Sequence, residues 1–389
     1  MSLEFAVPGQ GVVLFAAAAD ACAFVVSDAA RADGLLVEWA AAGVTVRRIS
    51  APAPYDACAP HAALSDSPPL FAAAIGAGVP CWFSLDAQNL RLAAGVGEAR
   101  LETCVYRCRL PAADDAERRA NKAFLESLTS VGSFVAAAPL RLIRDPVANA
   151  LPLRVRAGVS LDSLAKQLYL PAAHLPPASR QLFECVAGCE LDADDFPEFS
   201  RAVAQSIAAG WCARRLAEKA GEFGDDPAAT YLRITLGANG GESPGAPYVL
   251  EIWPAGHYSP VHSHAGAEAV IKVLHGGIQV QLFPFLAAGV APFATADFAA
   301  GDVTWISPAL NQTHQLRNRG DGPCITIQCY MYGFDDDAHY DYFDYLDGAA
   351  VKRFEPDSDM EFAAFKELMR AEWAGRPAAP RGGLACFGL

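Results

Sequence analysis

A succession of short β-rich segments begins at about residue 228 and constrains the fold of this chain more than any other feature. Branched and aromatic residues fill the segments, and Gly, Pro and Asn stand between them. Short strands with turn residues at regular spacing are typical of an all-β barrel or sandwich. The segments are TYLRITLG, YVLEIWPAG, AEAVIKVLHG, GIQVQLFPF, GDVTWIS, HQLRN and CITIQCYMYG.

The sequence before this region has a different character, and the whole chain is predicted to be an α+β multidomain protein. Residues 1–125 are expected to form a small α/β region, in which GVVLF and VTVRRIS are strands and ADGLLVEWAAAG is a helix ending at Gly43. Residues 126–194 are expected to be a mainly helical connecting segment, and residues 195–389 the unit that holds the β-rich region. Within these parts, FPEFSRAVAQSIAAGWCARRLAEKAGEFG is expected to form one long amphipathic helix. No motif assigns a role to residues 1–125.

Charge and cysteine content limit the classes of partner and the compartment. The net charge of -14 argues against nucleic acid or an anionic membrane surface as the partner, because both attract an excess of Lys and Arg. The 11 cysteines are odd in number and scattered, which is typical of reduced thiols in the cytosol. No Lys or Arg precedes Arg31 and no apolar stretch reaches membrane-spanning length, so we expect a soluble cytoplasmic protein.

The segment GHYSPVHSHAGAE, from Gly256 to Glu268, is rich in histidine in a chain that has only 8. His262 and His264 are two residues apart, so on a strand both imidazoles point the same way, here into a barrel. Metal coordination needs such convergence, because each ring nitrogen must lie roughly 2 Å from the ion. The expected third ligand is His314, which follows a turn rich in Pro and Asn and precedes a β-like stretch.

These histidines have surroundings that resemble the two motifs of the cupin family, whose fold is a jelly-roll type of β-barrel. The first motif matches at Gly256, His262, His264, Glu268 and Gly276. The second matches at Gly301, Pro308, His314 and Asn318. A narrower resemblance, over about residues 195–365, is to thiol dioxygenases of the cysteine dioxygenase type. Its matching positions are Arg233, Gly256, His257, Tyr258, Ser259, His262, His264, Lys272, Leu274, Gly276, His314, Asn318 and Tyr330.

The narrower resemblance implies a reaction and a role for each matching side chain. His262, His264 and His314 would hold Fe(II), with O₂ as co-substrate, and a small thiol would be oxidised to its sulfinic acid. The substrate partner would be a small carboxylate-bearing thiol such as cysteine or 3-mercaptopropionate. Arg233 would grip its carboxylate, with help from Tyr231. Tyr330 would hydrogen-bond the substrate or bound oxygen.

Three positions depart from the pattern of that family. Ala269 stands where some members have a cysteine that crosslinks to the tyrosine. Gln328 replaces a pocket histidine and can orient Tyr330, but it cannot shuttle a proton. Glu268 stands where ordinary cupins can place a fourth ligand, although Ala269 holds the equivalent position in the thiol dioxygenases.

Two other functions remain open on the sequence alone. If Glu268 binds the metal, the chain would be a cupin metalloenzyme with a site of three His and one Glu acting on a carbon substrate. If nothing is catalysed, the barrel would sense a small acid in a regulatory protein. In that regulatory protein the N-terminal region would transmit the signal. If the chain is a thiol dioxygenase, the N-terminal half is expected to pack against the barrel, cover its mouth or mediate oligomers.

Overall fold

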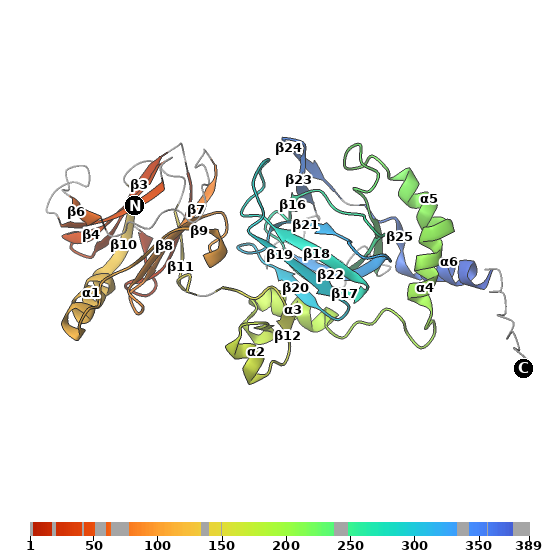
Figure 1. The fold of residues 1–389 in the computed structure, drawn as a ribbon, viewed down its shortest axis with the longest axis horizontal. Coiled ribbons are helices and arrows are strands. Elements are labelled where there is room, and N and C mark those ends of the chain that lie inside the picture. Colours follow the sequence, from red (N-terminus) through yellow and green to blue (C-terminus); the bar gives the residue numbers. More distant parts are fainter. Residues whose placement is uncertain are drawn as a thin grey trace, which may run out of the picture.

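The computed structural model describes residues 3–17, 21–40, 43–50, 60–63, 78–133, 140–148, 150–236, 248–332, 342–355 and 357–375. Figure 1 shows a β-sandwich at one end, a second two-sheet β-structure in the middle and a group of helices at the far end.

Two antiparallel sheets make up the N-terminal sandwich. In spatial order the first contains β1 (Leu3–Glu4), β10 (Leu128–Ser133), β3 (Cys22–Asp28), β4 (Asp33–Ala40), β5 (Gly43–Ser50) and β6 (Pro60–Ala63). The second contains β11 (Arg141–Ile143), β2 (Gln10–Ala16), β7 (Pro80–Asp86), β8 (Arg91–Val96) and β9 (Cys104–Arg109). Phe24 of the first sheet meets Phe15 and Phe83 of the second, with ring centroids 5.3 and 5.9 Å apart, so the sheets share one core.

The helix expected within residues 32–43 is wrong, because this stretch forms β4 between β3 and β5. Leu35, Leu36 and Val37 are all buried, so both faces of the strand are apolar. A short run without alternation cannot be told from a buried helix by its period. The described part of residues 1–125 is therefore a β-sandwich, and β10 and β11 extend it into the segment expected to be mainly helical. A short turn of 3-10 helix, η2 (Leu101–Thr103), and the helix α1 (Asp115–Ser127) are added to it.

The C-terminal half contains two further sheets. In spatial order the first contains β13 (Leu170–Pro171), β12 (Val155–Arg156), β20 (Val303–Ile306), β17 (Glu268–His275), β22 (Cys324–Met331), β15 (Tyr248–Trp253), β14 (Leu232–Leu236) and β25 (Met360–Glu361). The second contains β19 (Ala294–Ala299), β18 (Gly277–Leu282), β21 (Thr313–Arg317), β16 (His262–Ser263), β23 (Phe343–Asp347) and β24 (Ala350–Phe354). The β-rich segments predicted from the sequence all fall on these strands.

The order of the eight consecutive strands β15 to β22 defines the architecture of this half. One sheet has the order β15-β22-β17-β20 and the other β16-β21-β18-β19. This is the strand order of a jelly roll, which is built from two Greek keys. Trp253 and Val273 of one sheet pack with Val280 and Leu282 of the other, so the inner faces of the sheets enclose a common interior.

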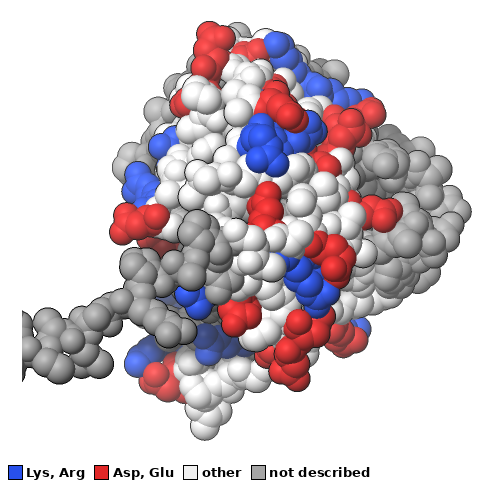
Figure 2. All heavy atoms as spheres, turned by 90° about the vertical axis from the view of Figure 1, so that its right-hand side faces the viewer, with Lys and Arg blue, Asp and Glu red and all other residues white. Residues whose placement is uncertain are grey.

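Helices cover the outer face of the first sheet of the barrel. They are α3 (Pro177–Val186), α4 (Phe199–Ala209), α5 (Trp211–Glu218) and α6 (Phe362–Ala374), which share a core with that face. The short helix α2 (Leu161–Ala165) has no buried residue and is not one of them. Figure 2 shows the end of the molecule where α4, α5 and α6 lie, and acidic and basic groups are interspersed on it. None of the helices in the described ranges is long and apolar enough to cross a membrane.

The single long helix expected between residues 196 and 224 is instead two helices, α4 and α5, with a break at Gly210. Gly210 has extended backbone angles, and a side chain there would collide with the carboxylate of Glu372 on α6. The same carboxylate accepts a hydrogen bond from the backbone N–H of Trp211 at 2.8 Å and so caps the start of α5. The break depends on a contact with α6, which the local amphipathic pattern does not reveal.

Candidate metal centre

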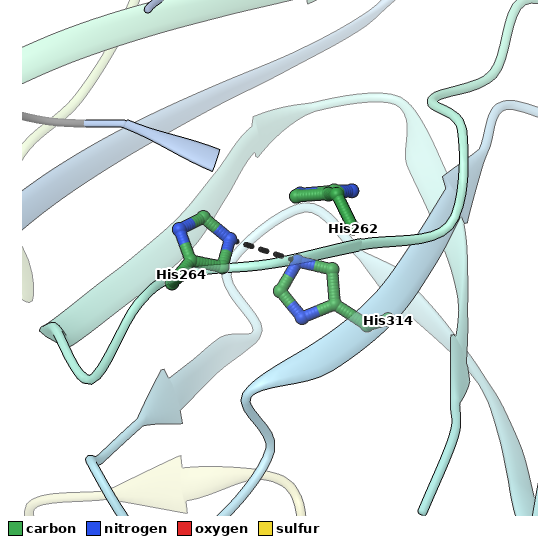
Figure 3. A group of neighbouring side chains, drawn as sticks. All are labelled: His262, His264 and His314. Atoms are coloured by element: carbon green, nitrogen blue, oxygen red, sulfur yellow. Dashed lines mark hydrogen bonds between the residues drawn. The ribbon is translucent and has the colours of Figure 1, made fainter. Parts of the chain in front are cut away.

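The three histidines that the sequence singled out converge inside the barrel (Figure 3). His262 lies on β16 and pairs in register with His314 on β21, while His264 follows at the end of β16. All three are buried, and their ligand atoms lie within 4.8 Å of one another. A buried three-histidine cluster of this kind can bind a metal ion.

The hydrogen bonds of the rings determine which nitrogens are available. Nδ1 of His262 lies 3.0 Å from the carbonyl oxygen of Pro260, and Nδ1 of His314 lies 3.1 Å from that of Asn311. A carbonyl oxygen only accepts, so each Nδ1 carries the proton and donates it. The Nε2 lone pairs of both rings are therefore left for a ligand, which is how metal-binding histidines are usually oriented.

The distances around His264 also fit a metal. Its Nε2 lies 3.2 Å from Nε2 of His314. Two nitrogens bound about 2 Å from one ion in neighbouring positions are about 3 Å apart, so this separation suits a shared ion. Nδ1 of His264 is buried and has no hydrogen-bond partner among the described residues. The donor set of three imidazoles thus fits a divalent transition metal.

The protonation state of the rings agrees with this geometry. Burial lowers the pKa of His262 to about 4 and, together with the neighbouring His262, lowers that of His314 to about 3. Burial also holds the pKa of His264 well below its ordinary value, and the other two histidines and Arg233 act in the same direction. All three rings are therefore neutral at pH 7, which is the form that binds metals.

A chain of buried polar groups runs beside the histidines on the neighbouring strands β22, β15 and β14. The hydroxyl of Tyr330 donates to the amide oxygen of Gln328, and the amide nitrogen of Gln328 donates to the carboxylate of Glu251. The other carboxylate oxygen of Glu251 lies 3.5 Å from Nη1 of Arg233. The structure thus links the expected substrate and catalytic positions, and it adds Glu251, which the sequence reasoning did not single out.

Two aromatic rings connect this chain to the histidines. The ring of Tyr330 stacks on that of His264 with centroids 5.6 Å apart. Phe343 of β23 lies 4.5 Å from His264 and 5.3 Å from His262, measured between ring centroids. The guanidinium carbon of Arg233 lies 5.9 Å from the Tyr330 ring and 6.0 Å from the Phe343 ring. Phe343 therefore forms an apolar wall beside the histidines, and the sequence reasoning missed it.

A small cavity lies between the histidines and the side chains of Tyr330 and Phe343. Its volume is about 50 Å³, several times the space that one buried water requires, so it suits a ligand of a few heavy atoms. Tyr231 borders it and stacks on Trp253 with ring centroids 4.3 Å apart. The polar residues around it include His262, His264, His314, Glu251, Gln328 and Tyr330.

Glu268 lies outside the histidine cluster. Its carboxylate accepts a hydrogen bond from the hydroxyl of Ser179 on α3, on the outer side of β17, and burial raises its pKa. The next residue, Ala269, is fully buried and pairs in register with Tyr330. Successive side chains on a strand point to opposite faces, so the inward position belongs to Ala269 and not to Glu268.

Glu268→Ala is therefore expected to leave metal binding unchanged. Metal titration should give a Kd within about twofold of the unaltered protein, while the lost hydrogen bond to Ser179 lowers the stability by about 1 kcal/mol. Loss of the metal in this variant would show that Glu268 is a ligand after all.

The other histidines and cysteines of the described residues do not join the cluster. Nδ1 of His257 lies 2.9 Å from the carbonyl oxygen of Thr230, which holds it in the turn after β15. Cys104 and Cys108 are buried on β9, and burial raises the pKa of both thiols. Among the described residues, His262, His264 and His314 are the one group found that can hold a metal ion.

Comparison with known proteins gives similarity to solved structures alone. No protein-family model matches the chain, and no curated protein matches it. A cupin 2 domain-containing protein from Halorhodospira halophila is 18% identical over 39% of this chain and 86% of that chain, with a TM-score of 0.22. The protein TT1209 from Thermus thermophilus is 19% identical over 26% of this chain and 82% of that chain, with a TM-score of 0.20.

A recombinant oxalate oxidase in complex with glycolate is 18% identical over 26% of this chain, with a TM-score of 0.23. The match spans 51% of that protein, which is about half of its length. TM-scores of this size carry no weight for function. The strand order identifies part of the chain as a jelly roll, which is an architecture that cupins share with other proteins. This jelly roll encloses a buried three-histidine cluster.

Proposed function

We propose that this protein is a cupin-type iron enzyme that oxidises a small thiol to its sulfinic acid with O₂. The observation that carries the proposal is the cluster of three neutral histidines beside the chain of Tyr330, Gln328, Glu251 and Arg233. The overall conversion of RSH and O₂ to RSO₂⁻ and H⁺ balances without a further reductant. Fe(II) at such a site supplies the oxygen chemistry and lowers the pKa of a thiol bound to it.

Among the described residues no carboxylate belongs to the histidine cluster, which supports iron with open positions. A site with three protein ligands leaves room on an ion that prefers six. The described carboxylate nearest in sequence, Glu268, points to the other side of β17. The reading with three His and one Glu therefore loses the residue on which it depended, and the open three-histidine reading is favoured.

Tyr330 and Gln328 act as a unit in this proposal. Tyr330 is fully buried, borders the cavity and keeps its ring against His264. The amide oxygen of Gln328 accepts a hydrogen bond from the phenol hydroxyl, which fixes the direction of the hydroxyl, and the amide nitrogen of Gln328 donates to Glu251. The phenol oxygen is thus oriented to accept a hydrogen bond from the substrate, while Gln328 positions it without exchanging a proton.

Arg233 and Glu251 together define the polar end of the substrate in this proposal. The guanidinium has five N–H donors, so it can hold a substrate carboxylate while it remains beside Glu251. Glu251 in turn attracts a substrate ammonium group and repels a carboxylate. The pair favours a zwitterionic thiol such as cysteine, with its carboxylate at Arg233 and its ammonium at Glu251. Phe343 and Tyr231 exclude water from the bound thiol.

Glu251→Gln is expected to change the binding of carboxylate thiols and of ammonium thiols in opposite directions. The change removes one negative charge beside Arg233, so the KM for 3-mercaptopropionate should fall by about tenfold, equivalent to about 1.4 kcal/mol of binding. The KM for cysteamine, which carries an ammonium group and no carboxylate, should rise. Oxygen uptake measured over a range of concentrations of each thiol gives the two KM values. If both KM values change in the same direction and by the same factor, Glu251 does not discriminate between substrates by their charge.

The function itself is tested by oxygen uptake of the iron-loaded protein with cysteine, 3-mercaptopropionate and cysteamine. We expect uptake with carboxylate-bearing thiols, and formation of the matching sulfinate seen by mass spectrometry. His314→Ala protein treated in the same way is the control. If no thiol gives uptake above this control, the proposed function is wrong.

A further inference from the structure

The N-terminal sandwich contacts the loop that leads into β21, the strand that carries the candidate metal ligand His314. Residues 97–100 form the turn between β8 and η2, and Arg100 in this turn has a side chain that is only 1% exposed. Its Nη1 donates to Oδ1 of Asn311 at 2.8 Å, across the boundary between sandwich and barrel. Asn311 lies three residues before His314, in the loop between β20 and β21.

Asn311 passes this contact on to the histidine. Its side-chain Nδ2 donates to the carbonyl oxygen of Trp305 at 3.0 Å, so Arg100 and Trp305 hold the two ends of the amide. Its backbone carbonyl oxygen accepts the hydrogen bond from Nδ1 of His314 at 3.1 Å. The residue has a left-handed backbone with φ of 62°, a conformation that asparagine tolerates better than most residues. The two hydrogen bonds of the Asn311 side chain therefore also hold its backbone carbonyl in place, and that carbonyl orients the ring of His314.

A second contact from the same turn is made with Gln312, the residue after Asn311, whose side chain reaches the turn that follows His264. Oε1 of Glu98 accepts a hydrogen bond from the backbone N–H of Gln312 at 2.9 Å. The side chain of Gln312 accepts from the N–H of Gly266 at 3.0 Å and donates to the carbonyl oxygens of Ala267 and Ser307 at 2.8 and 2.6 Å. Gly266 and Ala267 form the turn just after His264. Gln312 thus joins the loop of His264 to the loop of His314, and Glu98 holds Gln312.

The turn is built tightly into the barrel. The charge of Arg100 is balanced by Glu98 and Glu102, whose carboxylates lie 3.5 and 3.1 Å away. Its guanidinium also lies 4.8 Å from the centroid of the Phe293 ring. A side chain at position 97 would collide with the backbone and ring of Pro284. The φ of 89° at Gly97 also favours glycine. Buried, compensated charge of this kind sets geometry more reliably than a surface contact.

We propose that residues 97–100 of the sandwich position the metal ligands of the barrel. Arg100 sets the ring of His314 through Asn311, and Glu98 sets the separation of His264 and His314 through Gln312. The N-terminal sandwich is then a structural part of the metal centre. The proposal rests on the three histidines holding a metal ion and is independent of the reaction that follows.

The test is a titration of the full-length, metal-free protein with Co²⁺, followed by its visible absorption, which reports the ligand geometry. The variants are Arg100→Met, Asn311→Gly and the two combined. Asn311→Gly removes the side-chain link but keeps the left-handed backbone and the carbonyl that His314 uses. We expect each single change to weaken Co²⁺ binding by about tenfold and to shift the absorption, as is usual when a partner of a ligand is lost. The double variant should bind Co²⁺ about as tightly as the single ones, because both changes break one link.

Arg154→Met is the matched control. Arg154 joins the connecting segment to the barrel through Asp302 at 3.2 Å and covers the ring of Phe298 at 4.9 Å, but it contacts neither ligand loop. This variant should lose stability and keep the Co²⁺ affinity and absorption of the unaltered protein.

The outcomes separate this proposal from the proposed function. Folded Asn311→Gly protein with unchanged Co²⁺ affinity and absorption overturns the positioning role, even if Arg100→Met fails to fold. An unaltered protein that binds no Co²⁺ overturns it as well. An unaltered protein that binds Co²⁺ more tightly than the two variants, but whose iron form oxidises no thiol, supports the positioning role and contradicts the thiol dioxygenase.

Discussion

Protein carrying His314→Ala is expected to bind Fe(II) or Co²⁺ at least 100-fold more weakly than the unaltered protein and to consume no oxygen with any thiol. The change removes one of only three converging nitrogens, and no carboxylate of the described residues stands in the cluster to replace it. It also removes the ring whose Nε2 lies 3.2 Å from that of His264, so the remaining pair has no fixed partner across the cavity. Metal content after gel filtration and isothermal titration measure the loss.

His257→Ala is the matched control for this change. His257 belongs to the same histidine-rich segment, but its ring is tied to the carbonyl oxygen of Thr230 and lies outside the cluster. It should keep one metal ion per chain with normal affinity. A His314→Ala protein that still holds its metal as tightly as the His257→Ala protein would refute the three-histidine site.

Metal-free protein is expected to lose stability steeply as the pH falls below about 6.5. In the folded state burial holds the pKa of His262 at about 4 and that of His314 at about 3, and keeps the pKa of His264 well below its ordinary value. In the unfolded chain all three take up protons near pH 6.5. Between these limits the unfolded state binds more protons, so the stability is present above pH 6.5 and is lost as the pH falls. The free energy of unfolding should fall by about 4 kcal/mol per pH unit.

Urea unfolding at pH 7, 6 and 5 of the unaltered protein and of His314→Gln measures this effect. The variant lacks one of the three titrating rings, so its slope should be shallower by about one third. Burial raises the pKa of Glu98 and Glu268, and these groups act in the opposite direction in both proteins. The difference between the two slopes therefore isolates His314, and equal slopes would mean that this ring is not held neutral by the fold.

The histidine cluster could be predicted from the sequence because the signals for it are local. The spacing of two between His262 and His264 places both rings on one face of a strand, and turn residues separate each strand from the next. His314 followed from the expectation that a later strand folds back beside this one, and the structure pairs it directly with His262. The alternation of side chains along the strand predicted that Ala269 and Glu268 point to opposite faces, and the structure confirms this.

The roles of Glu251 and Arg100 could not be predicted from the neighbouring sequence, because they depend on contacts between distant parts of the chain. Glu251 sits in an apolar strand, and its partners Arg233 and Gln328 come from the strands on either side. Arg100 lies 211 residues before Asn311, with nothing in its own surroundings to indicate the barrel. The interpretation of residues 32–43 as a helix failed for a different reason. Both faces of β4 are buried, so its sequence lacks the alternation of apolar and polar residues that indicates a strand.

The buried pair of Arg233 and Glu251 has a consequence for the selection of acids by the cavity. An arginine with no internal counterpart would attract acetate, phosphate and other abundant anions whenever the cavity opened to solvent. Here each such anion has to compete with a carboxylate that is already in place 3.5 Å away and cannot diffuse off. A molecule that brings only a negative charge gains little by that exchange. Under the proposed function, a molecule that also carries a thiol has a second contact, at the three histidines. The cavity is therefore expected to bind thiol carboxylates and to exclude simple carboxylic acids.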